Sequence, residues 1–112
     1  MDIVHDTSGG MAVMRLSGRL DTSTSAGVEK TILEQLAAPG SRALLDMRNV
    51  VYVSSAGLRV VLVAAKRAKT VQGGLALFGL QPSVQEVFDL SGFSRILTIA
   101  PDELAARGAI AG

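Results

Sequence analysis

Apolar and polar residues follow two different rhythms along the chain. Short apolar runs of strand length lie at residues 2–6, 11–18, 42–50, 73–79 and 95–99. The segments between the later runs repeat apolar residues every three or four positions, which is typical of a helix that buries one side. We therefore expect strands and helices to alternate over most of the chain.

The first two runs are expected to form a hairpin. Ser8, Gly9 and Gly10 separate residues 2–6 from residues 11–18, and these residue types favour a tight turn. A connection this short joins antiparallel strands.

The helical segments carry start and stop signals. For the first helix, the N-cap hydroxyls are those of Thr22, Ser23, Thr24 and Ser25. The apolar residues at helical spacing are Val28, Ile32, Leu33 and Leu36. Pro39-Gly40 is expected to end it, and a second helix is expected to start near residue 55. A third begins around Pro82 and stops at Ser91-Gly92, with an apolar side of Val84, Val87, Phe88 and Leu90. A last helix is expected within residues 100–112.

The resulting order is β-β-α-β-α-β-α-β-α, which predicts an α/β fold. Strands that alternate with helices form right-handed crossovers and a mostly parallel sheet. The hairpin adds an antiparallel edge to that mixed sheet. With 112 residues, the chain is expected to form a single domain over residues 1–112 with about four helices.

Composition narrows the function classes. The chain is 48% hydrophobic, so it can form an aliphatic core, but only 4% aromatic, which argues against stacking platforms for nucleic acid. Its net charge of +1 shows no electrostatic footprint for nucleic acid or anionic membrane. The longest apolar stretch, residues 60–65, is far shorter than the roughly 20 residues of a membrane helix. No signal peptide is evident at the N-terminus. We expect a soluble, cytoplasmic protein without direct membrane insertion.

No metal or cofactor is expected. The chain has no cysteine, which excludes disulfides and thiolate chemistry. Gly73-Gly74 matches no phosphate-binding fingerprint. Asp21 and Asp46 are expected near the same end of the sheet, at strand ends, but their spacing matches no metal motif, so we interpret them as solvated loop acids.

Two hydroxyls interrupt the most apolar part of the chain. Ser54 and Ser55 separate the apolar run before them from the apolar helix after them, at the carboxyl end of a strand, where α/β sheets place functional sites. One of them is expected to cap the helix. The other interpretations are a catalytic nucleophile and a phosphorylation site, since a helix N-terminus favours an anion.

Catalysis is the least supported of these interpretations. The nucleophile motif Gly-x-Ser-x-Gly is absent because Val53 stands two residues before Ser55. The only histidine is His5, in the first strand, so a triad would depend on that residue alone.

Three segments resemble the STAS domain family, and within it the bacterial anti-sigma factor antagonists. The first, "LSGRLDTST" (16–24), is similar to the family's Leu-(Ser/Thr)-Gly-x-Leu-Asp motif. The second, "LLDMRNVVYVSSAGLRVVL" (44–62), is similar to the segment in which the family's helix starts with Asp-Ser-(Ser/Thr/Ala)-Gly-Leu. The third, "PSVQEVFDLSGFSRILTI" (82–99), is similar to the segment in which a family helix ends with Phe-Asp-x-(Ser/Thr)-Gly. They occur in the family's order and span nearly the whole chain.

The resemblance implies a binding module that is not an enzyme. Its partner would be an anti-sigma factor with serine kinase activity and a Bergerat-type ATP site, which releases the antagonist by phosphorylating it, and a PP2C-type phosphatase would reverse the modification. The family's phosphoacceptor lies two positions before the Gly-Leu glycine, which is Ser55 here. Ser54 stands where the family often has Asp, and is the alternative acceptor. The implied partner surface comprises Asp21, Thr22, Ser54, Ser55, Ala56, Gly57, Leu58 and Arg59.

Two other hypotheses stay open at this point. The first is a STAS subunit of a transport or stressosome-like assembly that works without phosphorylation. The second is a small serine hydrolase that uses Ser55.

Overall fold

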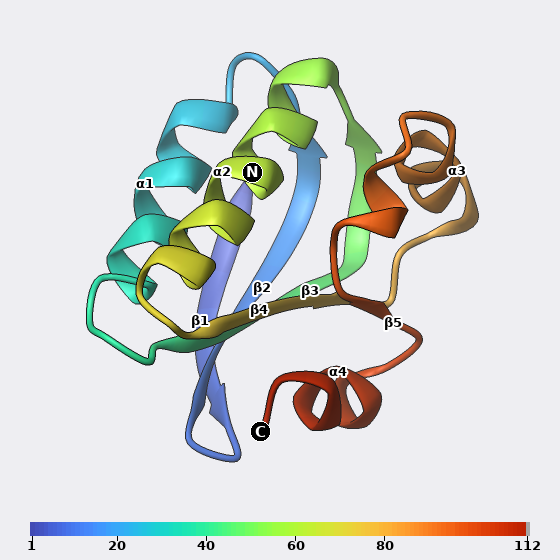
Figure 1. The fold of residues 1–112 in the computed structure, drawn as a ribbon. Helices are drawn as coiled ribbons and strands as arrows, with labels where there is room; N and C mark the ends of the chain where they lie inside the picture. The colour runs from blue at the N-terminus through green and yellow to red at the C-terminus, as the bar shows by residue number, and fades with distance from the viewer. Residues whose placement is uncertain (112) are drawn as a thin grey trace.

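A five-stranded sheet forms the centre of the molecule in the computed structural model, which describes residues 1–111. The strands lie in the order β1-β2-β3-β4-β5 (Figure 1). Their bounds are Asp2–Ser8 (β1), Met11–Leu20 (β2), Arg42–Val53 (β3), Gly74–Phe78 (β4) and Ile99–Ala100 (β5). β1 pairs antiparallel with β2, and every later pair is parallel. The predicted mixed sheet with an antiparallel hairpin edge is therefore confirmed.

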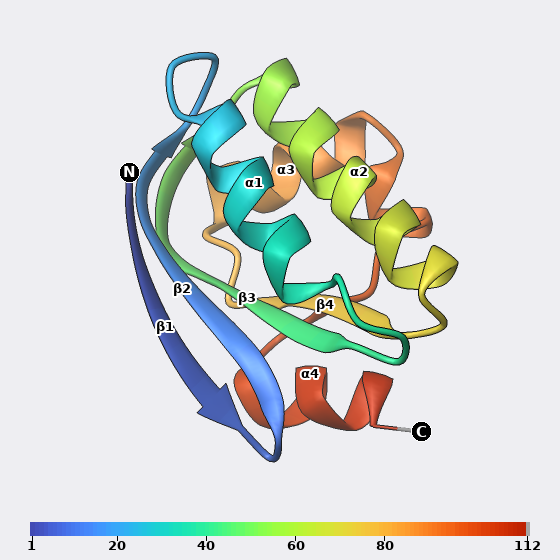
Figure 2. The same cartoon turned by 90° about the vertical axis from the view of Figure 1, so that its left-hand side faces the viewer.

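Helices cover both faces of this sheet, with two long helices on one face and a short helix on the other (Figure 2). Their bounds are Ser25–Gln35 (α1), Ser55–Thr70 (α2), Pro82–Leu90 (α3) and Glu103–Ile110 (α4), with a short 3₁₀ turn at Phe93–Arg95 (η1). α1 and α2 lie side by side on one face, and α4 lies on the opposite face (Figure 2). The predicted α/β architecture with four α-helices agrees with the part of the chain that the structure describes.

The two faces of β2 contribute to two separate cores. Met14, Leu16 and Leu20 pack toward α1 and α2, in the larger core. Met11 and Val13 point the other way, into a smaller core closed by α4. After Leu16 the α4 face carries only partly or fully exposed residues, because α4 spans just the first half of β2. The carboxyl ends of β2 and β3 thus stay open on that face.

An ionic network fastens α4 to the sheet. Arg15 of β2 donates to Asp6, Asp46 and Glu103, at 3.0, 3.0 and 2.8 Å. Asp46 is only 2% exposed and also accepts two hydrogen bonds from the Arg48 guanidinium. Burial raises the pKa of Asp46, but hydrogen bonds from Arg48 and Arg15 outweigh that effect and hold the pKa below its ordinary value.

The expectation that Asp46 ends its strand was wrong. β3 continues to Val53 because it pairs with the long β2 as far as Leu20, which leaves Asp46 in the middle of the strand. Asp21 follows the end of β2, so the two carboxylates do not lie at the same end of the sheet.

Three further expectations need correction. The last strand is Ile99–Ala100 and not residues 95–99, since residues 93–95 turn into η1 after Gly92, whose φ of 79° is left-handed. Leu90 is 81% exposed, whereas Val84 and Phe88 of α3 are buried and Val87 packs against the core. α1 ends at Gln35, before Pro39, and the neighbouring Leu36 is buried.

A membrane-spanning helix is not found: within residues 1–111, none of the helices has both the length and the apolar character to cross a bilayer.

Candidate functional site

The end of β2 and the start of α2 meet at one backbone carbonyl. Leu20 and Val53, the last residues of β2 and β3, are register partners. The N–H of Ser54 then donates to the carbonyl of Leu20 at 2.9 Å. This bond holds the loop after β2 beside the N-terminus of α2, so two of the segments that carry the predicted site residues are neighbours.

Gly57 allows this close approach. A Cβ atom at position 57 would lie 2.6 Å from the carbonyl oxygen of Leu20 and 2.8 Å from its Cγ. Only a residue without a side chain lets the first turn of α2 rest on the end of β2. The glycine in the Ser-Ala-Gly-Leu motif therefore has a packing role, independent of any partner.

Ser54 is the N-cap of α2. Its backbone is extended, and its hydroxyl accepts a hydrogen bond from the N–H of Gly57 at 3.3 Å. Its carbonyl accepts from the N–H of Leu58 at 2.9 Å. The prediction that one of the two serines caps the helix is confirmed, and the capping residue is Ser54.

Ser55 is the first residue of α2, and its side chain is exposed. Among residues 1–111 its hydroxyl forms no hydrogen bond, in contrast to that of Ser54. The N–H groups of Ser55 and Ala56 likewise have no acceptor within this range. Free amides and the helix dipole both favour an anion at this place.

Asp21 organises the loop between β2 and α1. Its carboxylate accepts hydrogen bonds from the backbone N–H and the hydroxyl of Ser23, at 3.0 and 2.7 Å, and its Oδ2 lies 3.6 Å from Nε of Arg19. Its carbonyl accepts from the N–H of Ser25 at 2.9 Å. The Ser23 hydroxyl is the main reason that the pKa of Asp21 lies below its ordinary value. Asp21 is therefore an anion in a fixed position.

Arg19 and Tyr52 add a feature that sequence reasoning missed. They are register partners on β2 and β3, and the Arg19 guanidinium lies 4.1 Å from the centroid of the Tyr52 ring. Tyr52 is 41% exposed and its neighbour Val51 is 54% exposed. Exposed Tyr and Arg side chains are frequent hot spots of protein interfaces. The cross-strand pair of Arg19 and Tyr52 was missed because it depends on strand register.

The predicted partner residues divide by burial. Thr22, Ser55 and Arg59 are exposed, and Asp21, Ser54 and Ala56 are half-buried. Gly57 and Leu58 are buried, and Leu58 belongs to the larger core. The last two residues shape the helix start, while the others are accessible at or near it.

The structure offers little for catalysis or metal binding at this surface. His5 pairs with Met14 in the middle of β2, and no hydrogen bond within the described chain links it to either serine. No group of three His, Asp or Glu residues in residues 1–111 could hold a metal ion. The exposed Ser55 hydroxyl is thus a group that can be modified, without a base beside it.

Three comparisons relate the chain to known proteins. The STAS domain family model matches residues 2–106. The chain is 38% identical over 109 residues to a Bordetella bronchiseptica protein, BtrV, named as a proposed anti-sigma factor antagonist, and the match covers 97% of this chain and 94% of that protein. It is 31% identical over 98 residues to the anti-sigma F factor antagonist of Paenibacillus polymyxa, with 87% and 84% covered.

Solved structures show the same fold. An anti-sigma factor antagonist from Mycobacterium paratuberculosis superposes with a TM-score of 0.87 at 20% identity, over 99% of this chain and 94% of that one. The Bacillus cell fate determinant SpoIIAA in its phosphorylated form gives a TM-score of 0.71 at 20% identity, over 96% and 99% of the two chains.

Proposed function

The chain belongs to the STAS domain family, and we propose that it is an anti-sigma factor antagonist controlled by phosphorylation of Ser55. Residues 1–112 act as one domain. In its unphosphorylated state it binds an anti-sigma factor that is also a serine kinase, with a Bergerat-type ATP site. That binding frees a sigma factor or another client. A regulator of sigma factors works where transcription takes place, so we place it in the cytoplasm.

Phosphorylation and its reversal form a cycle in this proposal. The partner kinase transfers the γ-phosphoryl group of ATP to the Ser55 oxygen, ADP leaves, and the antagonist is released. A PP2C-type phosphatase hydrolyses the phosphoserine to serine and phosphate. The chain itself is a substrate and a binding module, and it carries out no reaction of its own.

One observation carries the choice of Ser55: the two adjacent serines have different environments. The Ser54 hydroxyl is engaged in capping, at 3.3 Å from the N–H of Gly57, whereas Ser55 is exposed and makes no hydrogen bond with its side chain in the described part of the molecule. A kinase can reach Ser55 without uncapping α2. Ser54, in contrast, is half-buried, and its hydroxyl is already occupied within the first turn of α2.

The same surroundings explain how a phosphate could act. It adds about −1.5 to −2 charges and three acceptor oxygens, and the free N–H groups of Ser55 and Ala56 favour such an anion at the helix start. The helix therefore remains folded. The affinity of the partner decreases instead, because a bulky charge now occupies a surface that already holds the anion Asp21.

The test uses a serine kinase with a Bergerat-type ATP site that binds the protein. The protein is incubated with that kinase and ATP, and the phosphate is located by mass spectrometry. We expect one phosphate, on Ser55, and we expect Ser54→Ala to remain a substrate while Ser55→Ala does not. Phosphate on Ser54 instead, or no transfer from a kinase that binds the protein, contradicts the proposal.

A further inference from the structure

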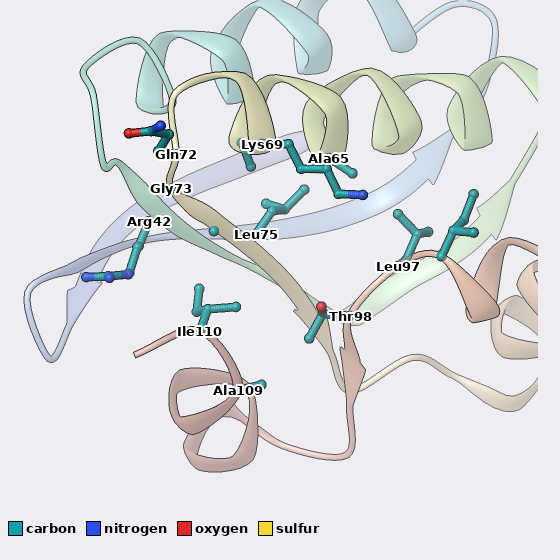
Figure 3. Close-up of a pocket in the computed structure, with 13 residues that line it drawn as sticks. Arg42, Ala65, Lys69, Gln72, Gly73, Leu75, Leu97, Thr98, Ala109 and Ile110 are labelled. Carbon is teal, nitrogen blue, oxygen red and sulfur yellow. The ribbon is translucent and has the colours of Figure 1, made fainter. Parts of the chain in front are cut away.

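A groove lies at the opposite end of α2 from Ser55. It encloses about 350 Å³ and is bounded by the last turns of α2, the beginning of β4, the segment before β5 and the end of α4 (Figure 3). Aliphatic side chains line part of it, from Ala65, Leu75, Leu97 and Ile110, and polar side chains line the rest, among them Arg42, Gln72 and Thr98. Lys69 provides a cation on the α2 side.

An open sheet edge forms the floor of this groove. β4 pairs with β5 only at Leu77 and Phe78, so Gly74, Leu75 and Ala76 have no strand beside them on this side. The N–H of Leu77 donates to the carbonyl of Thr98 at 2.9 Å, whereas the N–H of Gly74 donates to Ser41 on the β3 side at 3.0 Å.

These two bonds fix the direction in which Leu75 points. Alternate residues of a strand direct their N–H and C=O to the same neighbour, so Leu75, two positions before Leu77, faces the open edge. No backbone group of residues 1–111 bonds to its N–H or C=O there. Leu75 is nevertheless only 7% exposed. A nearly buried residue therefore presents one donor and one acceptor at the floor of the groove.

We propose that this groove binds a short extended peptide segment of a partner protein, which pairs with Leu75 and places a carboxylate beside Lys69. Strand addition to an open edge supplies main-chain hydrogen bonds, and the side pockets supply specificity. Side chains of an added strand alternate, so one aliphatic side chain of the peptide would lie beside Ala65 on one side of β4 and the next beside Ile110 on the other (Figure 3). The open stretch holds about three residues, since β5 occupies the edge from Leu77 onward.

The chemistry favours a peptide over other occupants. A paired donor and acceptor on one backbone residue matches another backbone, which presents the same pair in reverse order. Lys69 makes no ion pair among residues 1–111, and it lies on the wall of the groove, so an acidic segment is complementary in charge. Figure 3 shows Lys69 and Ala65 on one side of β4, with Ile110 and Ala109 on the other.

The groove and the Ser55 surface can be occupied at the same time. Ser55 is the first residue of α2 and Lys69 the last but one, so the rise of the helix separates them by about 20 Å. The groove therefore adds a second contact to a protein whose first contact is at Ser55. This inference uses the open sheet edge, Lys69 and the lining of the groove, and none of these involves phosphorylation of Ser55.

The test is an NMR titration of the full-length ¹⁵N-labelled protein. The probe is an acetylated, amidated hexapeptide of alternating valine and threonine that ends in aspartate. The control peptide has proline in place of the central valine, which removes a main-chain donor. We expect the first peptide to shift the amide signals of Leu75, Ala76 and Thr98 and to slow hydrogen exchange at Leu75. We expect the proline peptide to bind at least about fivefold more weakly.

Two charge variants test whether Lys69 contributes to peptide binding. Lys69→Glu should weaken peptide binding about threefold to tenfold, while Lys66→Glu, the same change on an exposed lysine that does not line the groove, should change it less than about twofold. Absence of shifts at Leu75 with millimolar peptide overturns the proposal. Equal binding of the proline peptide also overturns it, because apolar adhesion would then explain the shifts. Shifts at Leu75 that depend on protein concentration without peptide would make a second copy the occupant, and would overturn it as well.

Discussion

The α-carbon of Gly57 lies so close to the carbonyl of Leu20 that a Cβ atom at this position would be 2.6 Å from the carbonyl oxygen. Two segments far apart in sequence thus meet without a side chain between them. Since Ser54 also donates to this carbonyl, the geometry of the site depends on the contact. Gly57 therefore links the packing of α2 to the position of Ser55.

Gly57→Ala is expected to destabilise the protein by about 1–3 kcal/mol, because the new methyl group forces α2 away from β2. Gly27→Ala is the matched control. Gly27 lies in α1 with nothing within 4 Å of a new Cβ, so the helix propensity of Ala should stabilise the protein by about 0.5–1 kcal/mol. Urea unfolding measures both. Equal free energies for the two variants would show that the contact with Leu20 has no energetic weight.

The two serines are expected to differ in their effect on stability. Ser54→Ala removes the cap on the N–H of Gly57 and should cost about 1 kcal/mol. Ser55→Ala removes an exposed hydroxyl without a partner among residues 1–111 and should stay within about 0.5 kcal/mol of the parent. Thermal and urea unfolding of both variants check this. A larger cost for Ser55→Ala would mean that its hydroxyl has a structural task.

Much of the fold was predictable because each element carries its own local signals. The Ser-Gly-Gly turn predicts the β1–β2 hairpin, and the apolar period after Ser55 predicts α2, with its cap within one residue. The site could be located for the same reason, since a cap and a Gly-Leu pair stand together in the sequence. These features depend on neighbours in the chain, which the sequence displays directly.

The remaining features depend on partners that are distant in the chain. The length of β3 is set by β2, and the register shifts once between Arg15 and Ser17 and again between Gly18 and Arg19. Val51 is the extra residue of the second shift, so Val51 and Tyr52 are exposed in succession, which no simple alternation predicts. The contact of Arg19 with Tyr52 requires that register. Asp46 looked like a loop acid because Arg15, one of its two cationic partners, comes from a distant part of the chain.

Acid is expected to weaken the ionic network around Asp46. The pKa of Asp46 is lower in the folded protein than its ordinary value of 3.8, so its stabilising effect is complete above about pH 5 and is lost as the pH falls through the folded-state pKa. Asp46→Asn should cost about 2 kcal/mol at neutral pH, because Arg15 loses one of its charged acceptors.

Urea unfolding between about pH 7 and pH 3 checks this expectation, with the difference between Asp46→Asn and the parent as the readout. That difference should shrink as Asp46 in the parent becomes protonated. Asp102→Asn, which changes an exposed carboxylate at the cap of α4, serves as a control for general loss of negative charge. A difference that stays constant down to pH 3 would contradict a lowered pKa at Asp46.

A negative charge at position 55 is expected to act on partner binding much more than on folding. Ser55→Asp places a carboxylate where the proposed phosphate would lie, at an exposed helix start that tolerates anions. Its affinity for the anti-sigma factor that binds the unphosphorylated parent should fall at least about tenfold, which corresponds to about 1.4 kcal/mol. Ser55→Ala should bind as tightly as the unphosphorylated parent and should stay bound when ATP is added.

Ser54→Asp is the matched control for that measurement, because it adds the same charge one residue earlier. An aspartate at position 54 can take over the cap on the N–H of Gly57, so its carboxylate is directed into the helix end and away from a partner. We expect its affinity to stay within about threefold of the parent in calorimetric titrations. If Ser54→Asp weakened binding as strongly as Ser55→Asp, net charge at the helix start would control the partner, and the specific role of Ser55 would be refuted.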